Sequence, residues 1–254
     1  MRAKKSLGQN FIHDENFLNK LSKVILTDSK TNIIEIGPGK GALTKYLIKK
    51  RYKKIILIEK DYNLIKYLED LKGENNKIII INADALNLDL LDLNISQNSV
   101  IVGNLPFNIS SQLLVKWTKF NYWPPFYQKM YLMFQKELGE RIIARENSKS
   151  YGRISVLSQS RFNIKKLFTA PSGIFTPKPK VDGIVLEFSP IKNYKNINII
   201  KLETILRKAF LHRRKKIKSS LKEYKEILEL NKFDLDLRAE NLTINDYCKL
   251  SDLI

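Results

Sequence analysis

Short apolar runs alternate with amphipathic segments between residues 32 and 102. The runs span Ile33–Ile36, Ile55–Ile58, Ile78–Ile81 and Val100–Val102. Continuous Ile and Val runs, without alternation of apolar and polar positions, are typical of strands covered on both faces. The segments after the first two runs place apolar residues at helical spacing. The pattern therefore predicts a parallel, doubly wound α/β sheet with right-handed crossovers.

Beyond Phe107 the chain continues with mixed elements and then changes to helices alone. We expect a helix carrying Leu113, Leu114 and Trp117, a strand running into a helix over residues 129–145, and a helix followed by a strand over residues 150–168. A proline-rich loop then precedes a last strand at Ile184–Phe188. Only helical patterns follow Pro190. We therefore predict one domain over residues 1–190 and a small all-α domain over residues 191–254.

Composition excludes several classes of protein. With 43% hydrophobic residues the chain can bury a core, which excludes wholesale disorder. The single cysteine, Cys248, excludes a disulfide framework, and two histidines with one cysteine cannot furnish a Cys/His zinc site, so we expect no metal. No apolar run approaches the roughly 18 residues of a spanning helix. We expect a cytoplasmic protein with no membrane partner.

The charge is strongly basic and it is clustered. Lys and Arg number 45 against 26 Asp and Glu, a formal net charge of +19. Acidic residues are missing from Asn147–Val181 and again from Thr204–Lys222. Such tracts indicate a surface for nucleic acid, with a merely solvated basic surface as the alternative. The candidate contacts are Arg153, Lys165, Lys178, and Arg213, Arg214, Lys215 and Lys216 in an expected basic helix.

Loops that follow the predicted strands carry the candidate chemistry, because ligands of open α/β sheets bind beyond the carboxyl ends of the strands. The first loop, GPGKG, contains Gly37 and Gly39 and favours a ligand close to the backbone. Glu59 ends the second strand, where a carboxylate can accept hydrogen bonds from a ribose diol. A nicotinamide dinucleotide and S-adenosylmethionine fit these features almost equally well, and a plain β–α turn is the third possibility.

The next two loops distinguish these ligands. Asp84 follows the third strand, where it can accept a hydrogen bond from an adenine amino group or make an Asx turn. Asn104-Leu105-Pro106-Phe107 follows the fourth strand and matches the [Asn/Asp/Ser]-x-Pro-[Tyr/Phe] signature of methyltransferases that modify an exocyclic amino nitrogen. An ordinary turn with a core phenylalanine is the alternative interpretation.

The tetrapeptide suits that reaction for a physical reason. An aromatic amine is a poor nucleophile because its lone pair is delocalised into the ring. Two fixed acceptors, the Asn104 side-chain oxygen and the Leu105 carbonyl, can hold both amino hydrogens and favour a pyramidal nitrogen. Pro106 stiffens the turn and Phe107 offers a face for the base. Base–aromatic stacking contributes ~1–3 kcal/mol, comparable to the cost of unstacking a base.

With these residues in place, nearly the whole chain resembles the ribosomal RNA adenine N6-dimethyltransferases. The matching segments are SLGQNFIHD (6–14), EIGPGKGALT (35–44), IEKD (58–61), NADAL (82–86), GNLPFNIS (103–110), MFQKELGERIIARENSKSYGRISVLSQ (133–159), FTPKPKVDG (175–183), AFLHRRKKIKSSL (209–221) and RAENLTINDYCKL (238–250). The resemblance implies a Rossmann-like class I methyltransferase fold, with a mostly parallel seven-stranded sheet and helices on both faces.

The resemblance also implies roles for individual residues. Asn10 and Ile12 would close over S-adenosylmethionine, with the glycine turn at its methionine part, Glu59 at its ribose and Asp84 at its adenine. Asn104 would lie where cofactor and target meet. Two positions depart from the family: Phe107 stands where the bacterial branch usually has tyrosine, and Gly183 where it usually has serine.

The implied activity is direct transfer of methyl to N6 of two adjacent adenosines in the 3′-terminal hairpin of 16S rRNA, on a 30S subunit precursor. No general base is required, because the proton can leave after attack. We expect a monomer. Three alternatives stay open: a 23S rRNA methyltransferase of the resistance type, a non-catalytic RNA-binding assembly factor, and a nicotinamide-dependent oxidoreductase.

Overall fold

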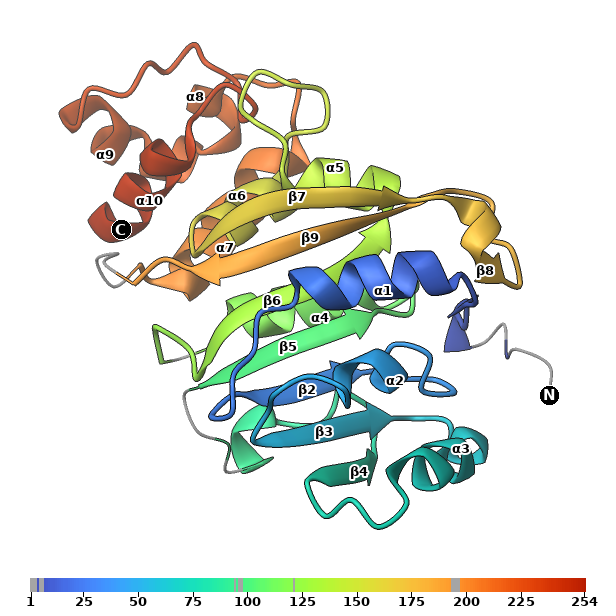
Figure 1. Ribbon diagram of the computed structural model, residues 1–254. Coiled ribbons are helices and arrows are strands. Elements are labelled where there is room, and N and C mark those ends of the chain that lie inside the picture. The colour runs from blue at the N-terminus through green and yellow to red at the C-terminus, as the bar shows by residue number, and fades with distance from the viewer. Residues whose placement is uncertain (1–3, 5–6, 94, 96–97, 121, 193–196) are drawn as a thin grey trace. The chain divides into compact units, whose positions relative to one another are not determined.

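A seven-stranded, mainly parallel sheet organises the computed structural model of the protein (Figure 1). The structure describes residues 4, 7–93, 95, 98–120, 122–192 and 197–254; Ser6, the first residue of one matching segment, lies outside them. The strand order is β4-β3-β2-β5-β6-β9-β7. The β2, β3, β4, β5 and β6 strands pair in parallel, whereas β9 is antiparallel to β6. The predicted parallel sheet is confirmed.

The strands follow the predicted apolar runs closely. They are β1 (Phe11–Ile12), β2 (Asn32–Ile36), β3 (Lys54–Glu59), β4 (Ile78–Asn82), β5 (Ser99–Asn104), β6 (Tyr127–Gln135), β7 (Phe162–Ala170), β8 (Phe175–Thr176) and β9 (Gly183–Pro190). The helices are α1 (Glu15–Val24), α2 (Thr44–Leu47), α3 (Tyr62–Lys72), α4 (Ser110–Thr118), α5 (Lys136–Ile142), α6 (Arg153–Gln159), α7 (Ile199–Leu211), α8 (Ile217–Ser220), α9 (Lys225–Leu230) and α10 (Ile244–Leu253), with 3₁₀ turns at Leu90–Leu93, Ser172–Ile174 and Lys222–Tyr224.

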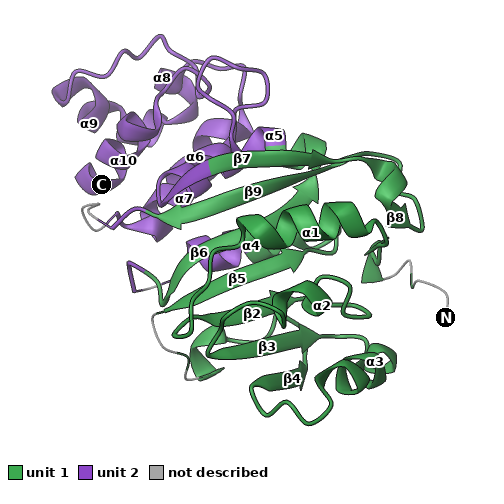
Figure 2. Ribbon diagram, in the orientation of Figure 1, with its two compact units in different colours: residues 1–113, 125–139, 165–190 green, residues 114–124, 140–164, 191–254 purple. Residues whose placement is uncertain are grey.

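Contacts divide the chain into two compact units that interleave along the sequence (Figure 2). Unit 1 contains residues 1–113, 125–139 and 165–190, and unit 2 contains residues 114–124, 140–164 and 191–254. After residue 190 the described residues form helices and turns, with one isolated bridge between Lys216 and Arg238. The two-domain division at residue 190 remains a prediction.

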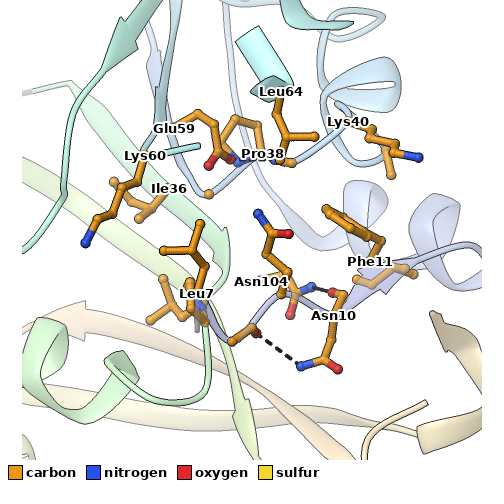
Figure 3. Close-up of a pocket in the computed structure, with 18 of the residues that line it drawn as sticks. Leu7, Asn10, Phe11, Ile36, Pro38, Lys40, Glu59, Lys60, Leu64 and Asn104 are labelled. Carbon is orange, nitrogen blue, oxygen red and sulfur yellow. Dashed lines mark hydrogen bonds between the residues drawn. The ribbon is translucent and has the colours of Figure 1, made fainter. Parts of the chain in front are cut away.

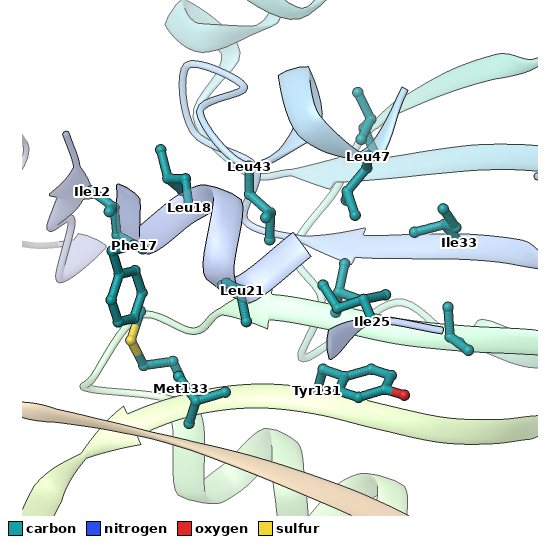
Figure 4. Packing of buried hydrophobic residues seen from close by; sticks show 14 of the residues in the cluster. Ile12, Phe17, Leu18, Leu21, Ile25, Ile33, Leu43, Leu47, Tyr131 and Met133 are labelled. Carbon is teal, nitrogen blue, oxygen red and sulfur yellow. The ribbon is translucent and has the colours of Figure 1, made fainter. Parts of the chain in front are cut away.

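Each unit has its own apolar core. In unit 1, α1 buries Phe17, Leu18 and Leu21 in a cluster with Tyr131 and Met133 of β6 (Figure 4). The helix starts at Asp14, whose carboxylate accepts a hydrogen bond from the Phe17 amide at 2.7 Å. In unit 2, residues of α6, α7 and α10 share a second buried cluster. The first core supports the strands whose ends carry the candidate site.

Three expectations from the sequence are wrong in detail. β4 is an edge strand with Ile79 37% exposed, so a continuous apolar run did not mean burial on both faces here. The expected basic helix at Arg213–Lys216 is instead the turn between α7 and α8, because α7 ends at Leu211. The proline-rich loop contains β8, which pairs with β1 in a separate two-stranded sheet. Strands of two residues leave no periodic pattern to read.

Candidate functional site

The carboxyl ends of β2 and β5 form the centre of the site. β2 pairs with β3 on one side and β5 on the other, so the chain leaves these two strands in opposite directions. Ligands of open α/β sheets bind at such a switch point. A cavity of about 750 Å³ opens there, within the ~300–1,000 Å³ typical of ligand pockets. Its lining includes residues 7–13, 35–40, 58–60, 83–85 and 104–109 (Figure 3).

All the predicted cofactor-binding and catalytic residues lie on this one cavity. They are Asn10, Ile12, Gly37, Gly39, Glu59, Asp84, Asn104, Leu105, Pro106 and Phe107. They come from five separate stretches of unit 1. The structure thus brings together side chains up to 97 positions apart, from Asn10 to Phe107.

The glycine turn after β2 has a backbone conformation that residues other than glycine rarely adopt. Gly37 and Gly39 have φ values of 65° and 63°. At Gly39 a Cβ atom would also lie 3.0 Å from the Phe11 ring, so the turn and residue Phe11 approach each other closely. The turn therefore presents backbone to the cavity, which suits a ligand that lies against it.

Glu59 joins this turn to the end of β3. Its Oε2 accepts a hydrogen bond from the Gly39 amide at 3.0 Å, and its Oε1 accepts one from the Asp61 amide at 2.8 Å. Burial raises the pKa of Glu59, and these backbone donors act in the opposite direction. Each carboxylate oxygen can accept a second hydrogen bond. Glu59 can thus hold the turn and still accept from a ribose diol.

Asp84 fits both interpretations offered by the sequence. Its Oδ1 accepts a hydrogen bond from the Leu86 amide at 3.0 Å, which is the Asx turn. Its Oδ2 pairs with Lys60 Nζ at 2.8 Å, and the residue lines the cavity. The Asp84 carboxylate therefore lies at the predicted position, where it already binds the Leu86 amide and Lys60.

Asn104 is held in one orientation by the N-terminal segment. Its Nδ2 donates to the Asn10 carbonyl at 2.8 Å, a contact that Figure 3 draws as a dashed line. Because the nitrogen is engaged there, Oδ1 is the atom left to accept hydrogen bonds from a ligand. The side chain is half-buried on the cavity wall. This is the acceptor that the sequence predicts.

The following residues present the second predicted acceptor. The Pro106 carbonyl accepts from the amides of Ile109 and Ser110, and the Phe107 carbonyl accepts from Ser110 Oγ. Within the described part of the chain no residue donates a hydrogen bond to the Leu105 carbonyl. The Leu105 carbonyl and Asn104 Oδ1 are thus two acceptors on the cavity that can take a hydrogen bond from a ligand.

Phe107 is half-buried and meets Phe175 edge to face, with ring centroids 6.4 Å apart. Phe175 belongs to β8 and is buried. An edge-to-face contact with one ring leaves at least one face of Phe107 uncovered by Phe175. The ring is thus positioned by a residue that the sequence pattern did not single out.

The basic candidates do not belong to this cavity. Arg153, Lys165 and Lys178 are exposed. Arg213 pairs with Glu240 at 2.6 Å and donates to the Ser148 carbonyl at 3.2 Å, so its charge is engaged inside unit 2. Lys216 pairs with Asp236 at 2.9 Å, and Arg214 and Lys215 are exposed.

Two features of the site were missed from the sequence. Glu35, 2% exposed, lies on the cavity wall and accepts from Thr44 Oγ1 at 2.7 Å. Burial raises its pKa to about 7. Asp61, also buried, binds Lys4 and Gln9. Only the position of each acid beside a strand end or a glycine turn could have pointed to them.

Neither a metal cluster nor a membrane span is evident within the described ranges. These residues hold no group of three or more His, Cys, Asp or Glu side chains arranged to bind a metal ion. None of their helices is long and apolar enough to cross a membrane.

Comparisons with known proteins agree with one another. The family model for ribosomal RNA adenine dimethylase matches residues 1–254. A ribosomal RNA small subunit methyltransferase A of Pelagibacter ubique is 40% identical over 98% of this chain and 96% of its own length. The same enzyme of Rhizobium etli is 36% identical over 98% of this chain and 92% of its own length.

Solved structures extend the similarity. A dimethyladenosine transferase from Plasmodium falciparum superposes with a TM-score of 0.80 at 25% identity, covering 94% of this chain and 95% of that one. The 23S rRNA methyltransferase ErmE superposes with a TM-score of 0.70 at 19% identity, covering 96% and 99%, which shows a shared fold. The Rossmann-like methyltransferase fold expected from the sequence is confirmed.

Proposed function

The chain belongs to the ribosomal RNA adenine dimethylase family, and from that premise we propose that it methylates N6 of two adjacent adenosines in the 3′-terminal hairpin of 16S rRNA, on a 30S subunit precursor. The protein is an rRNA adenine dimethyltransferase that uses S-adenosylmethionine. The observation that carries the choice of substrate atom is the Asn104 loop, which faces the same cavity as Glu59.

The residues on the cavity suit this cofactor. The glycine turn exposes backbone to the cavity, and the buried Glu59 carboxylate retains accepting capacity beside it. Bound S-adenosylmethionine supplies an activated methyl group on its sulfonium. The part of the protein is to hold Glu59 and Asp84 where ribose hydroxyls and an adenine amine can donate to them.

The Asn104 loop would act on the target amine. Asn104 Oδ1 and the Leu105 carbonyl can each accept one amino hydrogen, which turns the nitrogen lone pair out of conjugation. The Asn10 carbonyl keeps the amide from rotating, so the acceptor is in place before the base arrives. Phe107 can stack on the extruded base and offset part of the cost of unstacking it.

The proposal also includes the domain division, the RNA contacts, the oligomeric state and the cellular compartment expected from the sequence. Residues 1–190 would form the methyltransferase domain and residues 191–254 a helical domain that contacts the ribosomal particle. Arg153, Lys165, Lys178, Arg214, Lys215 and Lys216 would contribute attraction to RNA phosphates, with Arg213 acting within the helical unit. We propose a monomer in the cytoplasm, where an rRNA substrate is found.

Methyl transfer to purified particles tests the proposal. Small-subunit particles lacking the modification are incubated with the protein and S-adenosylmethionine, and the nucleosides are identified by mass spectrometry. Dimethylated adenosines at two adjacent positions near the 3′ end are expected. Large-subunit particles are the control. Product on these alone would mean the resistance-type activity, and binding of small-subunit particles without product would mean an assembly factor.

A further inference from the structure

Residues 7–12, here called the strap, line the cavity and lie against the Asn104 loop. A Cβ atom on Gly8, whose φ is 62°, would lie 2.6 Å from Asn108 Oδ1. Two residues further on, the Asn10 carbonyl accepts from Asn104 Nδ2 at 2.8 Å. The strap is thus seated against the loop that carries the proposed target acceptors.

Asp61, the N-cap of α3 two residues after the end of β3, binds the same strap. Its Oδ2 accepts from Gln9 Nε2 at 2.9 Å, and its Oδ1 pairs with Lys4 Nζ at 2.7 Å. Gln9 Oε1 in turn accepts from the Lys4 amide at 2.8 Å. Asp61, Gln9 and Lys4 therefore close a ring of three polar contacts around a carboxylate that is only 3% exposed.

The surroundings of Asp61 favour its ionised form. Burial raises the pKa of the carboxyl, but hydrogen bonds from Lys4, Gln9 and Asn63 outweigh it and hold the pKa at about 2. The group is thus ionised at neutral pH. A buried carboxylate with four donor groups from three residues is a strong anchor, because charge-assisted hydrogen bonds are about twice as strong as neutral ones.

We infer that Asp61 is a positioning residue for methyl transfer: by binding Gln9 it fixes the strap, and the Asn10 carbonyl then holds the Asn104 amide with its oxygen toward the target amine. The inference rests on the proposed function. Gln9 and Asn10 are adjacent in the chain, so a strap released from Asp61 also loses the position of the Asn10 carbonyl. The Asn104 amide would then rotate and present its nitrogen as often as its oxygen.

Asp61→Asn tests the inference with little other disturbance. Asp61 is the N-cap of α3, where its side chain accepts from the Asn63 amide, and asparagine caps helices equally well. The bond from the Asp61 amide to Glu59 is a backbone contact and stays. We expect kcat on small-subunit particles to fall roughly 10-fold or more, with an unchanged KM for the particles, because misplacement by about 1 Å can cost a factor of 10².

An exchange of donor and acceptor provides the rescue. Gln9→Glu alone sets two carboxylates against each other and should lower kcat as well. In Gln9→Glu/Asp61→Asn the amide introduced at position 61 can donate to the carboxylate introduced at position 9. That carboxylate can still accept from the Lys4 amide, and one negative charge remains in the ring. We expect this double variant to recover most of the wild-type kcat. Asp70→Asn, an exposed change of the same charge on α3, is the matched control.

A second measurement does not depend on turnover. Amide hydrogen exchange over residues 7–12, in the cofactor-free protein, should be faster in each single variant and return to the wild-type rate in the double variant. Thermal unfolding of all variants shows whether they fold. If Asp61→Asn does not fold, Gln9→Ala removes the same hydrogen bond by truncating its donor, a half-buried side chain of the strap. We expect Gln9→Ala to give the same loss of kcat and the same faster exchange.

Two results would overturn the inference. One is a wild-type kcat with wild-type exchange in Asp61→Asn. The other is a further loss of kcat when Asp61→Asn is added to Asn104→Ala, since residues acting through Asn104 cannot lower the rate once it is gone. If the wild-type protein methylated no small-subunit RNA, the proposed function would fail, whereas the exchange measurement would still report whether Asp61 holds the strap.

Discussion

The two walls of the cavity are built in different ways. The cofactor wall consists of the turns that directly follow β2, β3 and β4, and its internal bonds are short in sequence: Gly39 to Glu59 spans 20 residues and Asp61 to Glu59 only two. The target wall joins the Asn104 loop to the strap and to β8. Its bonds connect Asn104 with Asn10, 94 residues away, and pair β1 with β8.

This difference explains what each wall can do. The turns after β2, β3 and β4 are held side by side by the pairing of these three strands, so the cofactor wall needs no segment from outside the sheet. The target wall needs a distant segment to be seated on it, and its geometry therefore depends on a few side-chain contacts. We expect changes on the cofactor wall to alter binding, and changes on the target wall to alter turnover.

Of the changes considered, Asn104→Ala should have the largest effect, and it should lower turnover without changing cofactor binding. Removing one preorganised polar partner from a desolvated site typically lowers the rate by ~10²–10³, or roughly 3–4 kcal/mol of barrier. We expect that loss in kcat on small-subunit particles. Calorimetry should show nearly unchanged affinity for S-adenosylmethionine, because the Glu59 turn is not involved.

The matched control for this change is Asn19→Ala, which truncates an exposed asparagine on α1. It should leave kcat and cofactor affinity as they are. Near-normal dimethylation by Asn104→Ala would contradict the held-amine mechanism, even though the family membership would stand.

Glu35→Gln tests the cofactor wall through stability. Burial raises the Glu35 pKa from 4.5 to about 7, so ionising it costs the folded state more than the unfolded state. This contribution to stability is intact below pH 4.5 and is lost as the pH rises through about 7. Over the full pH range, the rise of the pKa from 4.5 to about 7 corresponds to a loss of roughly 3 kcal/mol in the free energy of unfolding.

Urea unfolding of the cofactor-free protein at pH 5 and pH 8 measures this loss. The wild type should lose about 2.5 kcal/mol relative to Glu35→Gln between the two pH values, because part of the loss has already occurred at pH 5 and glutamine, which can still accept from Thr44, does not titrate. Parallel pH dependences in the two proteins would show that Glu35 does not ionise in this range.

Much of the fold could be predicted from the sequence because the apolar runs coincide with the strands of the sheet. β2, β3 and β5 were predicted from apolar runs within one or two residues of their observed ends. β4 has the same pattern but lies at the sheet edge, and a strand's place in the order cannot be read from its own residues. At Arg213–Lys216 the sequence predicts helix where the structure has a turn, because the run lacks glycine and proline, the usual signals of a turn.

The candidate site could likewise be predicted in part from the sequence. The sequence predicted the loops on the cavity because they follow strands, and the motifs in those loops marked Glu59 and Asn104. It did not reveal that Gln9 binds Asp61 or that Phe175 meets Phe107, since both contacts join segments far apart in the chain. Arg213 was expected to face RNA, whereas Glu240 engages its charge.

Glu59→Ala should affect binding where Asn104→Ala affects turnover. Loss of a charge-assisted acceptor typically costs on the order of 1.5–3 kcal/mol, so the dissociation constant of S-adenosylmethionine should rise roughly 10-fold or more. At saturating cofactor, kcat should fall far less than in Asn104→Ala. Glu69→Ala, an exposed change on α3, is the control for calorimetry. Wild-type affinity in Glu59→Ala would remove this residue from the cofactor wall.

The smallest effect should come from cations that belong to neither wall. Arg214 and Lys215 are exposed on the turn after α7, whereas Arg213 pairs with Glu240. Arg214→Gln/Lys215→Gln should weaken binding of small-subunit particles and reduce the slope of log K against log salt by about 1–2, since each phosphate contact releases counterions. Arg213→Gln should instead lower the melting temperature of the protein, with less change in that slope. Cofactor affinity and kcat at saturating particle should stay constant in the double variant, because both cavity walls are intact. An unchanged salt dependence in Arg214→Gln/Lys215→Gln would mean that this turn is solvated surface and that other basic residues bind the RNA.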